Sequence, residues 1–338
     1  MSTSVRDALA RVLEGRALDA DAMESAMDAI LAGEATPAQI AGLAIALRMR
    51  GESPTELAAA ARAMRRRVVP PSIEIDGVLL DTCGTGGDGA GTFNVSTTCA
   101  VVVAACGVRV AKHGNRAVSS RAGSADVLEA LGVRVDASPE VVARHVRELG
   151  IGFLFAPAYH AALRHAAGVR RELGVRTFFN LLGPLANPAS ATHQLVGVYD
   201  AARVRTMAEV LGLLGVRAAW VVHGHGGLDE IAPEGATRVA RLEDGRVVED
   251  EIVPRDFGLE DAPIAGLSGG DAHDNARLVR AVLSGERGAR RSAVVINAAA
   301  ALIVAGAERD RRAARERVEA AIDSGAATRL LDAWVHAS

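Results

Sequence analysis

Residues 78–106 read VLLDTCGTGGDGAGTFNVSTTCAVVVAAC, and this stretch indicates the class of fold. Its first four residues, an apolar run of three followed by Asp81, predict a buried β-strand. A glycine-rich turn follows, and a helix is expected from about Ser96 to Cys106. A buried strand that leads through a tight turn into a helix is the repeating unit of α/β proteins.

The same alternation continues along the chain. Apolar runs predict further strands at residues 108–111, 133–135, 151–155, 193–199 and 218–222, with helical sequence between most of them. Strands that alternate with helices form a mostly parallel sheet covered by helices on both faces. Residues 242–247 are expected to form a hairpin turned at Asp244-Gly245. Helical, Arg-rich sequence at residues 158–185 interrupts this alternation, and residues 293–304 are expected to form a core helix.

The first seventy residues predict a small helical unit. Thr36-Pro37-Ala38-Gln39 and Ser53-Pro54-Thr55-Glu56 are both capping boxes with proline at the first helical position. Gly33 and Gly51 stand where helices are expected to end. The predicted fold class is therefore α/β, with a small all-helical domain and a large α/β domain whose mostly parallel central sheet is flanked by helices.

Composition and charge argue against several classes of protein. The 338 residues carry a formal net charge of -3, with acidic and basic residues interspersed, so no basic stripe indicates nucleic acid or a membrane as a partner. No run of eighteen apolar residues occurs, and the first fifteen residues do not resemble a signal peptide. The three cysteines form no Cys-x-x-Cys pair and are interpreted as core residues. We therefore expect a cytoplasmic protein.

The turn after the first strand is expected to bind an anion. Gly84-Thr85-Gly86-Gly87-Asp88-Gly89 lets the backbone approach a ligand closely and presents several N–H groups together. Thr92-Phe93-Asn94-Val95-Ser96-Thr97 adds a helix N-terminus and side-chain donors, which favours an anion such as pyrophosphate. Such a turn also occurs for structural reasons alone, and it matches neither familiar phosphate-loop pattern well. The carboxylate of Asp88 inside it indicates a metal or ribose hydroxyls nearby.

The segment after the second strand brings positive charge to the same place. It reads Lys112-His113-Gly114-Asn115-Arg116-Ala117-Val118-Ser119-Ser120. Because the carboxyl ends of parallel strands face one crevice, this loop and the glycine-rich turn should be neighbours. Lys112 is the only lysine among 38 basic residues, and a flexible ammonium differs chemically from a rigid guanidinium. We therefore interpret the segment as functional rather than as a polar surface loop.

A pair of adjacent carboxylates, Asp229-Glu230, follows another predicted strand. Mg²⁺ is bound by a few carboxylates, keeps several waters and bridges phosphates, so this pair predicts a magnesium site. The nearby His223-Gly224-His225 suggests zinc as an alternative. No further ligands at zinc spacing occur, and the flanking glycines provide a flexible frame, so magnesium is favoured.

Taken in order, these three segments resemble the anthranilate phosphoribosyltransferase family. Its members carry Gly-Thr-Gly-Gly-Asp running into Asn-Val-Ser-Thr, then Lys-His-Gly-Asn-Arg with serines, and later Leu-Asp-Glu. Three further segments also match in order, and these are Gly123-Ser124-Ala125-Asp126-Val127-Leu128, residues 179–188 and Asn297-Ala298-Ala299. The resemblance extends from the N-terminal helices to about residue 306.

The resemblance implies a fold and a reaction. Family members transfer the phosphoribosyl group of phosphoribosyl pyrophosphate (PRPP) to anthranilate in tryptophan biosynthesis, require Mg²⁺, and form homodimers through the helical domain. By this resemblance, residues 1–70 and about 164–188 form the small helical domain. Residues 72–163 and 189–338 form the large PRPP-binding domain.

The resemblance also implies which residues bind each substrate. The residues expected to bind PRPP are Gly84, Gly87, Asp88, Thr92, Asn94, Val95, Ser96, Thr97, Lys112, His113, Gly114, Asn115, Arg116, Ala117, Val118, Ser119, Ser120 and Ser124. Those expected to contact anthranilate or line its route are Gly84, His113, Asn115, Arg170 and Pro184. Those expected to hold Mg²⁺ are Ser96, Asp229 and Glu230.

The chain departs from the family pattern at one place. His160-Ala161-Ala162 stands where the family carries His-Pro followed by small residues, and Leu163 stands where some members have an aromatic residue. Both changes affect the expected lining of the anthranilate tunnel and leave the PRPP site intact.

Two alternatives stay open beside this interpretation. Pyrimidine nucleoside phosphorylases share the fold, but they carry a Lys-His-Ser-type phosphate loop, whereas Lys112-His113-Gly114-Asn115 has the transferase form. A non-catalytic relative that binds nucleotide or nucleic acid is expected to have lost the metal carboxylates and to carry a basic face. This chain keeps Asp229-Glu230 and has a negative net charge.

Overall fold

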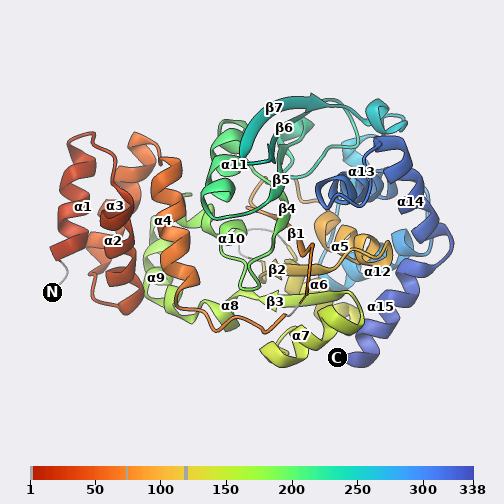
Figure 1. Cartoon of the computed structure of the whole chain (residues 1–338), viewed down its shortest axis with the longest axis horizontal. Helices are drawn as coiled ribbons and strands as arrows, with labels where there is room; N and C mark the ends of the chain where they lie inside the picture. The colour runs from red at the N-terminus through yellow and green to blue at the C-terminus, as the bar shows by residue number, and fades with distance from the viewer. Residues whose placement is uncertain (1–2, 74, 118–120) are drawn as a thin grey trace.

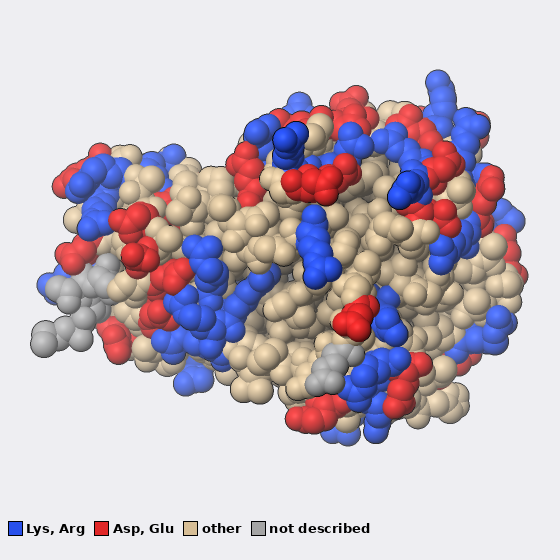
Figure 2. Space-filling view, viewed as in Figure 1, with Lys and Arg blue, Asp and Glu red and all other residues tan. Residues whose placement is uncertain are grey.

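The computed structural model describes residues 3–73, 75–117 and 121–338. Figure 1 shows a bundle of helices to one side of a larger body built around a sheet. The predicted fold class is thereby confirmed: an N-terminal helical bundle is joined to an α/β domain whose mostly parallel sheet is flanked by helices. On the face shown in Figure 2, basic and acidic side chains are mixed around the rim and on the helical bundle, while the centre of the face is mostly uncharged.

The helical bundle is formed by four consecutive helices and one later one. The consecutive helices are α1 (Thr3–Leu13), α2 (Ala20–Ala32), α3 (Pro37–Arg50) and α4 (Pro54–Arg65). Both predicted capping boxes are present, with the Thr36 and Ser53 hydroxyls accepting the backbone N–H groups of Gln39 and Glu56. Helix α9 (Arg164–Leu173) packs against α2 and α3, so the Arg-rich interruption of the alternation contributes a helix to the bundle.

The sheet contains seven strands in the order β3-β2-β1-β4-β5-β6-β7. Their bounds are β1 Leu80–Gly84, β2 Val110–Gly114, β3 Ile151–Phe155, β4 His193–Gly197, β5 Ala218–His223, β6 Thr237–Glu243 and β7 Arg246–Ile252. Strands β1 to β5 are parallel, and β6 and β7 add an antiparallel hairpin at one edge. The carboxyl ends of β1, β2, β4 and β5 therefore lie along one edge of the sheet.

The remaining helices cover the sheet. They are α5 (Val95–Ala105), α6 (Ser124–Leu131), α7 (Pro139–Glu148), α8 (Ala156–Tyr159), α10 (Leu182–Leu185), α11 (Val204–Leu213), α12 (Ala272–Leu283), α13 (Ala289–Val304), α14 (Arg311–Asp323) and α15 (Ala326–Ala337). Short 3₁₀ segments, among them Phe178–Asn180 and His225–Gly227, connect them. No helix among the described residues has the length and apolar character needed to cross a membrane.

Alternating residues of the strands pack into two different cores. On β4, Leu195 belongs to the core that contains α5 and α13, whereas Val196 belongs to the core that contains the helical bundle and α11. The apolar interior of the bundle is therefore continuous with one face of the sheet. This shared core holds the bundle, including α9, in a fixed position relative to the carboxyl edge of the sheet.

One predicted strand is wrong. Residues 133–135, all of them described, form no strand and connect α6 to α7. Val133 and Val135 are buried on either side of the exposed Arg134, which is the alternation that a half-buried strand shows. Here the two valines pack into the core beside the sheet, and their backbone pairs with no strand.

Candidate active site

Three loops meet at the carboxyl edge of the sheet. The glycine-rich turn follows β1, and the loop that carries Asp229 folds across it, so that an Asp229 carboxylate oxygen accepts the N–H of Gly86 at 2.8 Å. An ideal Cβ at Gly84 would lie 2.7 Å from this carboxylate, and one at Gly197 would lie 1.5 Å from the Asp229 carbonyl oxygen. Glycine at the paired ends of β1 and β4 is therefore what lets Asp229 reach the turn.

Glu230 lies against the N-terminus of α5. One of its carboxylate oxygens accepts the backbone N–H of Ser96 at 3.2 Å. The ammonium of Lys112 donates to the Ser96 hydroxyl at 3.3 Å and also to the Thr82 carbonyl. Lys112 is only 2% exposed, so the sole lysine lies beneath the expected metal ligands rather than on the solvent side of its loop.

Three carboxylates crowd this region. Burial, followed by the negative charge of Asp88, raises the pKa of Asp229, and burial, followed by the charge of Asp229, raises the pKa of Glu230. One carboxylate oxygen of Asp88 is buried and has no hydrogen-bond partner among the residues that the structure describes. Each of these effects would be reversed by a hard divalent cation bound to carboxylate oxygens.

The donor set fits Mg²⁺ better than zinc. Among the described residues, no group of three or more His, Cys, Asp or Glu side chains could hold a metal ion. This arrangement suits Mg²⁺, which usually takes one or two carboxylates and completes its shell with water and substrate phosphates. His223 instead uses its Nδ1 against the Val198 carbonyl, 2.8 Å away.

His113 is a buried, neutral imidazole. Its Nδ1 lies 3.1 Å from the Gly183 carbonyl oxygen, so the proton of the neutral ring belongs on Nδ1, and Nε2 has no partner among the described residues. Burial, with the neighbouring charges of His160 and Lys112, lowers the pKa of His113 to about 3. A ring with this pKa stays uncharged at neutral pH.

Other members of the expected PRPP set are engaged with the protein itself. The Arg116 guanidinium forms a fork on Glu129, at 2.6 and 2.7 Å, and also pairs with Asp126 at 3.0 Å. The Ser124 hydroxyl donates to the Asn115 carbonyl at 3.3 Å. Val118, Ser119 and Ser120 lie outside the described residues. The rest of the loops, Gly87, Thr92, Val95, Thr97, Gly114 and Ala117, lie on the same two turns and at the start of α5.

Comparisons with known proteins match the whole chain. A family model described as glycosyl transferase family, helical bundle domain, matches residues 6–68, and one described as glycosyl transferase family, a/b domain, matches residues 76–328. The anthranilate phosphoribosyltransferase of Myxococcus xanthus is 54% identical over 333 residues, which cover 98% of both sequences. The chain belongs to the anthranilate phosphoribosyltransferase family.

Solved structures of the family superimpose closely. The anthranilate phosphoribosyltransferase of Thermus thermophilus matches with a TM-score of 0.92 at 45% identity, covering 98% of this chain and 99% of that one. The enzyme of Saccharomyces cerevisiae, solved in complex with PRPP and Mg, matches with a TM-score of 0.91 at 27% identity. That match covers 100% of this chain and 98% of the yeast chain.

The residues expected to contact anthranilate come from both parts of the molecule. Arg170 belongs to α9 of the bundle, and its Cζ lies 5.8 Å from the centroid of the Phe179 ring. Burial lowers the pKa of Arg170. Pro184 lies in α10, next to the Gly183 carbonyl that holds His113, while Asn115 follows β2. The Phe179 ring that Arg170 contacts belongs to the same core as the bundle.

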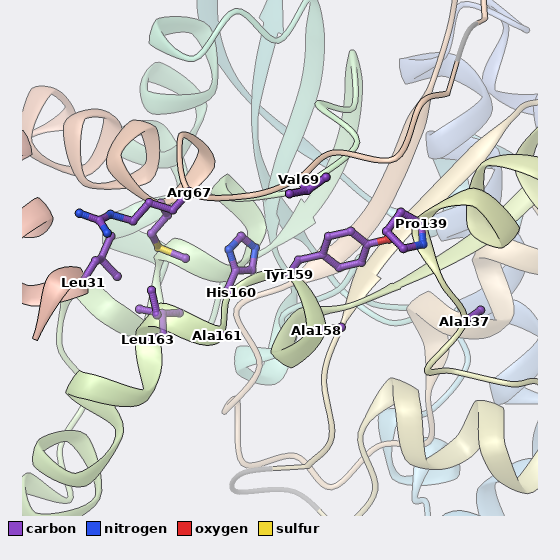
Figure 3. Close-up of a pocket in the computed structure, with 12 residues that line it drawn as sticks. Leu31, Arg67, Val69, Ala137, Pro139, Ala158, Tyr159, His160, Ala161 and Leu163 are labelled. Carbon is purple, nitrogen blue, oxygen red and sulfur yellow. The ribbon is translucent and has the colours of Figure 1, made fainter.

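The positions that depart from the family pattern line a cavity at the junction of the two parts (Figure 3). This cavity has a volume of about 280 Å³, and its lining includes Leu31, Arg67 and residues 158–163. The His160 ring lies edge-on to His113, with 5.2 Å between ring centroids. Ala161 and Leu163 are both among the residues that line this cavity.

Asn297, in the middle of α13, holds the carboxylate loop in place. Its side chain accepts the N–H of Ile231 at 2.9 Å and donates to the Ile231 carbonyl at 2.8 Å. It also donates to the Ala293 carbonyl at 2.9 Å, and it is fully buried. Because Ile231 follows Asp229 and Glu230 directly, this amide fixes the backbone that presents both carboxylates.

Replacing Asn297 with alanine is expected to lower the free energy of unfolding by about 2–4 kcal/mol, because both backbone groups of Ile231 lose their partner inside the core. Urea denaturation measures the change. Ser292→Ala, on the same helix and half-buried, serves as the control and should change stability by less than about 0.5 kcal/mol. Equal stabilities of the two variants would show that Ile231 is held by other contacts.

Two residues near the site were missed by the sequence analysis. Asn275 of α12 donates from its side-chain nitrogen to the Asn94 side-chain oxygen at 2.9 Å and accepts the Gly270 N–H at 2.7 Å. Arg176 follows α9 and places its guanidinium beside Gly87 of the glycine-rich turn. The only signal for Asn275 is an amide among the apolar positions of its helix, and Arg176 is hidden among the many arginines of residues 158–185.

Proposed function

We propose that this protein transfers the phosphoribosyl group of PRPP to the amine of anthranilate and releases pyrophosphate, as a step of tryptophan biosynthesis. One observation carries the proposal. Asp229 is bonded to the glycine-rich turn, while Glu230 and Lys112 both bond Ser96 at the start of α5. Amides, a cation and two carboxylates thus converge where a magnesium pyrophosphate would be bound.

The chemistry demands stabilisation of a leaving group. Anthranilate's amine is a weak nucleophile, because its lone pair is delocalised into the ring, so departure of pyrophosphate has to be made easy. Loop N–H groups and the start of the α5 dipole favour negative charge at this place, and Lys112 adds a buried positive charge. With a pKa of about 3, His113 is a poor base at neutral pH, so we do not propose it as the group that takes the proton from the attacking amine.

Mg²⁺ is proposed to be held by Ser96, Asp229 and Glu230. Bound there, the ion would neutralise charge on the pyrophosphate. The chain's own contribution is to set the two carboxylates side by side on a loop that Asn297 fixes, and to offset part of their mutual repulsion with Lys112. Arg170 and Asn115 are proposed to orient the aromatic acid for attack.

Assembly and location are further parts of the proposal. We propose a homodimer formed through the helical bundle in the cytoplasm. Leu13 and Met49, at the ends of the packed helices α1 and α3, are 72% and 83% exposed, which is unusual for large apolar side chains and suits an interface. Sedimentation equilibrium should give about twice the chain mass of 35.0 kDa, and a mass that stays at one chain would contradict the dimer.

The reaction is tested by identifying its products. Mass spectrometry of a mixture of protein, PRPP, anthranilate and Mg²⁺ should show phosphoribosylanthranilate, and a coupled assay should show one pyrophosphate released for each anthranilate consumed. Release of thymine from thymidine with inorganic phosphate, without use of PRPP, would instead support the nucleoside phosphorylase alternative.

A further inference from the structure

Arg176 occupies a junction of four parts of the molecule. Its Cζ lies 4.1 Å from the centroid of the Tyr199 ring, shortly after β4. Its backbone carbonyl accepts a hydrogen bond from Arg48 of α3. An ideal Cβ built on Gly87 would lie 3.2 Å from its Nη2 and 3.4 Å from its Nε, so the edge of the guanidinium faces the glycine-rich turn.

The guanidinium has no anionic partner among the residues that the structure describes. Several other arginines near the bundle pair with carboxylates: Arg203, for example, pairs with Glu52 at 2.7 Å. Arg176 forms no such ion pair within the described ranges and is half-buried, with the tyrosine ring as its main contact. A stacked, half-buried guanidinium without a carboxylate is a site prepared for an anion, because its planar fork is held in place before the ligand arrives.

We propose that Arg176 binds the pyrophosphate of PRPP from the side of the helical bundle. This inference rests on the proposed function. The contact with Gly87 places the guanidinium at the turn expected to hold PRPP, where loop N–H groups already favour an anion. Because Arg48 bonds the Arg176 backbone, the bound pyrophosphate would also connect the bundle to the sheet.

A different anion, the carboxylate of anthranilate, is the competing ligand. Arg170 lies six residues earlier on α9 and packs over Phe179, a different ring from the one that supports Arg176. The two arginines are therefore assigned different substrates. Arg176→Met should raise the KM for PRPP, whereas Arg170→Met should raise the KM for anthranilate.

Isothermal titration calorimetry with PRPP and Mg²⁺ tests the proposal. Arg176→Met should weaken PRPP binding roughly 10- to 100-fold, as expected for the loss of a charged hydrogen-bonding partner. Arg176→Lys should fall between this variant and the wild type, because a point charge replaces the fork. Arg171→Met, an exposed arginine of α9, is the matched control and should bind PRPP like the wild type.

Unchanged PRPP affinity in a folded Arg176→Met protein would overturn the proposal, and so would a raised KM for anthranilate alone. If Arg176→Met does not fold, Tyr199→Leu removes the supporting ring instead, and PRPP binding by that variant at wild-type strength would also overturn it. Measurements on the wild type distinguish a failure of the proposed reaction from a failure of the role proposed for Arg176. Wild-type protein that binds PRPP but consumes no anthranilate would contradict the proposed reaction, while the binding comparison at Arg176 would still decide this inference.

Discussion

Lys112→Met is expected to lower kcat/KM roughly 30- to 1000-fold, which corresponds to about 2–4 kcal/mol of lost transition-state stabilisation. Methionine fills a similar volume but carries no charge. The Ser96 hydroxyl loses its donor, and Glu230 loses the positive charge that opposes its burial. The value of kcat/KM should fall for both PRPP and anthranilate, because the pyrophosphate leaving group is no longer stabilised.

Steady-state kinetics with saturating Mg²⁺ measures this loss. Arg109→Met is the matched control. Arg109 is exposed and directly precedes β2, the strand that carries Lys112, so its replacement also removes one positive charge but does so at a distance from the site. Near-wild-type kcat/KM for Lys112→Met would show that the sole lysine serves only packing. Lys112→Arg should not restore activity, because the rigid fork does not fit a place shaped for a buried ammonium.

Asp229→Asn is expected to reduce activity by a similar factor and to weaken the response to Mg²⁺. The amide can still accept the Gly86 N–H, so the loop keeps its geometry while the ligand charge is lost. Activity measured as a function of Mg²⁺ concentration should half-saturate at a markedly higher concentration than in the wild type. A variant with an unchanged magnesium curve would remove Asp229 from the metal site.

The thermal stability of Asp229→Asn in the absence of metal should equal or exceed that of the wild type, although its activity is lower. The folded-state pKa of Asp229 is raised above its unfolded value by burial and by Asp88. A raised carboxyl pKa destabilises the fold as pH rises above about 4, and the penalty is complete once pH exceeds the folded pKa. In EDTA at alkaline pH, Asp229→Asn should therefore unfold at a temperature equal to or above that of the wild type.

Melting curves recorded with EDTA, and again with Mg²⁺ and PRPP, test this. Ligands that bind only the folded state should raise the wild-type Tm and raise the variant Tm less. A large drop of the Tm of Asp229→Asn in EDTA would indicate that Asp229 is needed for folding. The loss of activity in this variant would then not be evidence that Asp229 binds Mg²⁺.

Local signals were sufficient to predict the helical bundle and most of the sheet. The capping boxes at Thr36 and Ser53 depend only on neighbouring residues, and both form as expected. The alternation of Val133 and Val135 was misleading, because burial on alternate positions needs only a core on one side, whereas a strand also needs a neighbouring strand. No feature of the neighbouring sequence distinguishes a strand from a buried connecting segment of this kind.

The site was predicted where motifs follow strands, and missed where a contact depends on tertiary packing. Asp229 and Gly86 could be expected to meet, since both follow parallel strands of one sheet. That Lys112 is buried beneath Ser96, and that Arg116 turns toward Glu129, depends on side-chain packing that no spacing encodes. Arg176 reaches Gly87 only because α9 is packed into the bundle.

The most direct test of the proposed reaction uses the intrinsic fluorescence of anthranilate. Purified protein, PRPP and Mg²⁺ together should cause the signal to decay, omission of any one should leave it constant, and EDTA should abolish the decay. A constant signal in the complete mixture, with PRPP binding still detected by calorimetry, would contradict anthranilate as the acceptor. Of the proposed reaction, only the binding of PRPP would then remain supported.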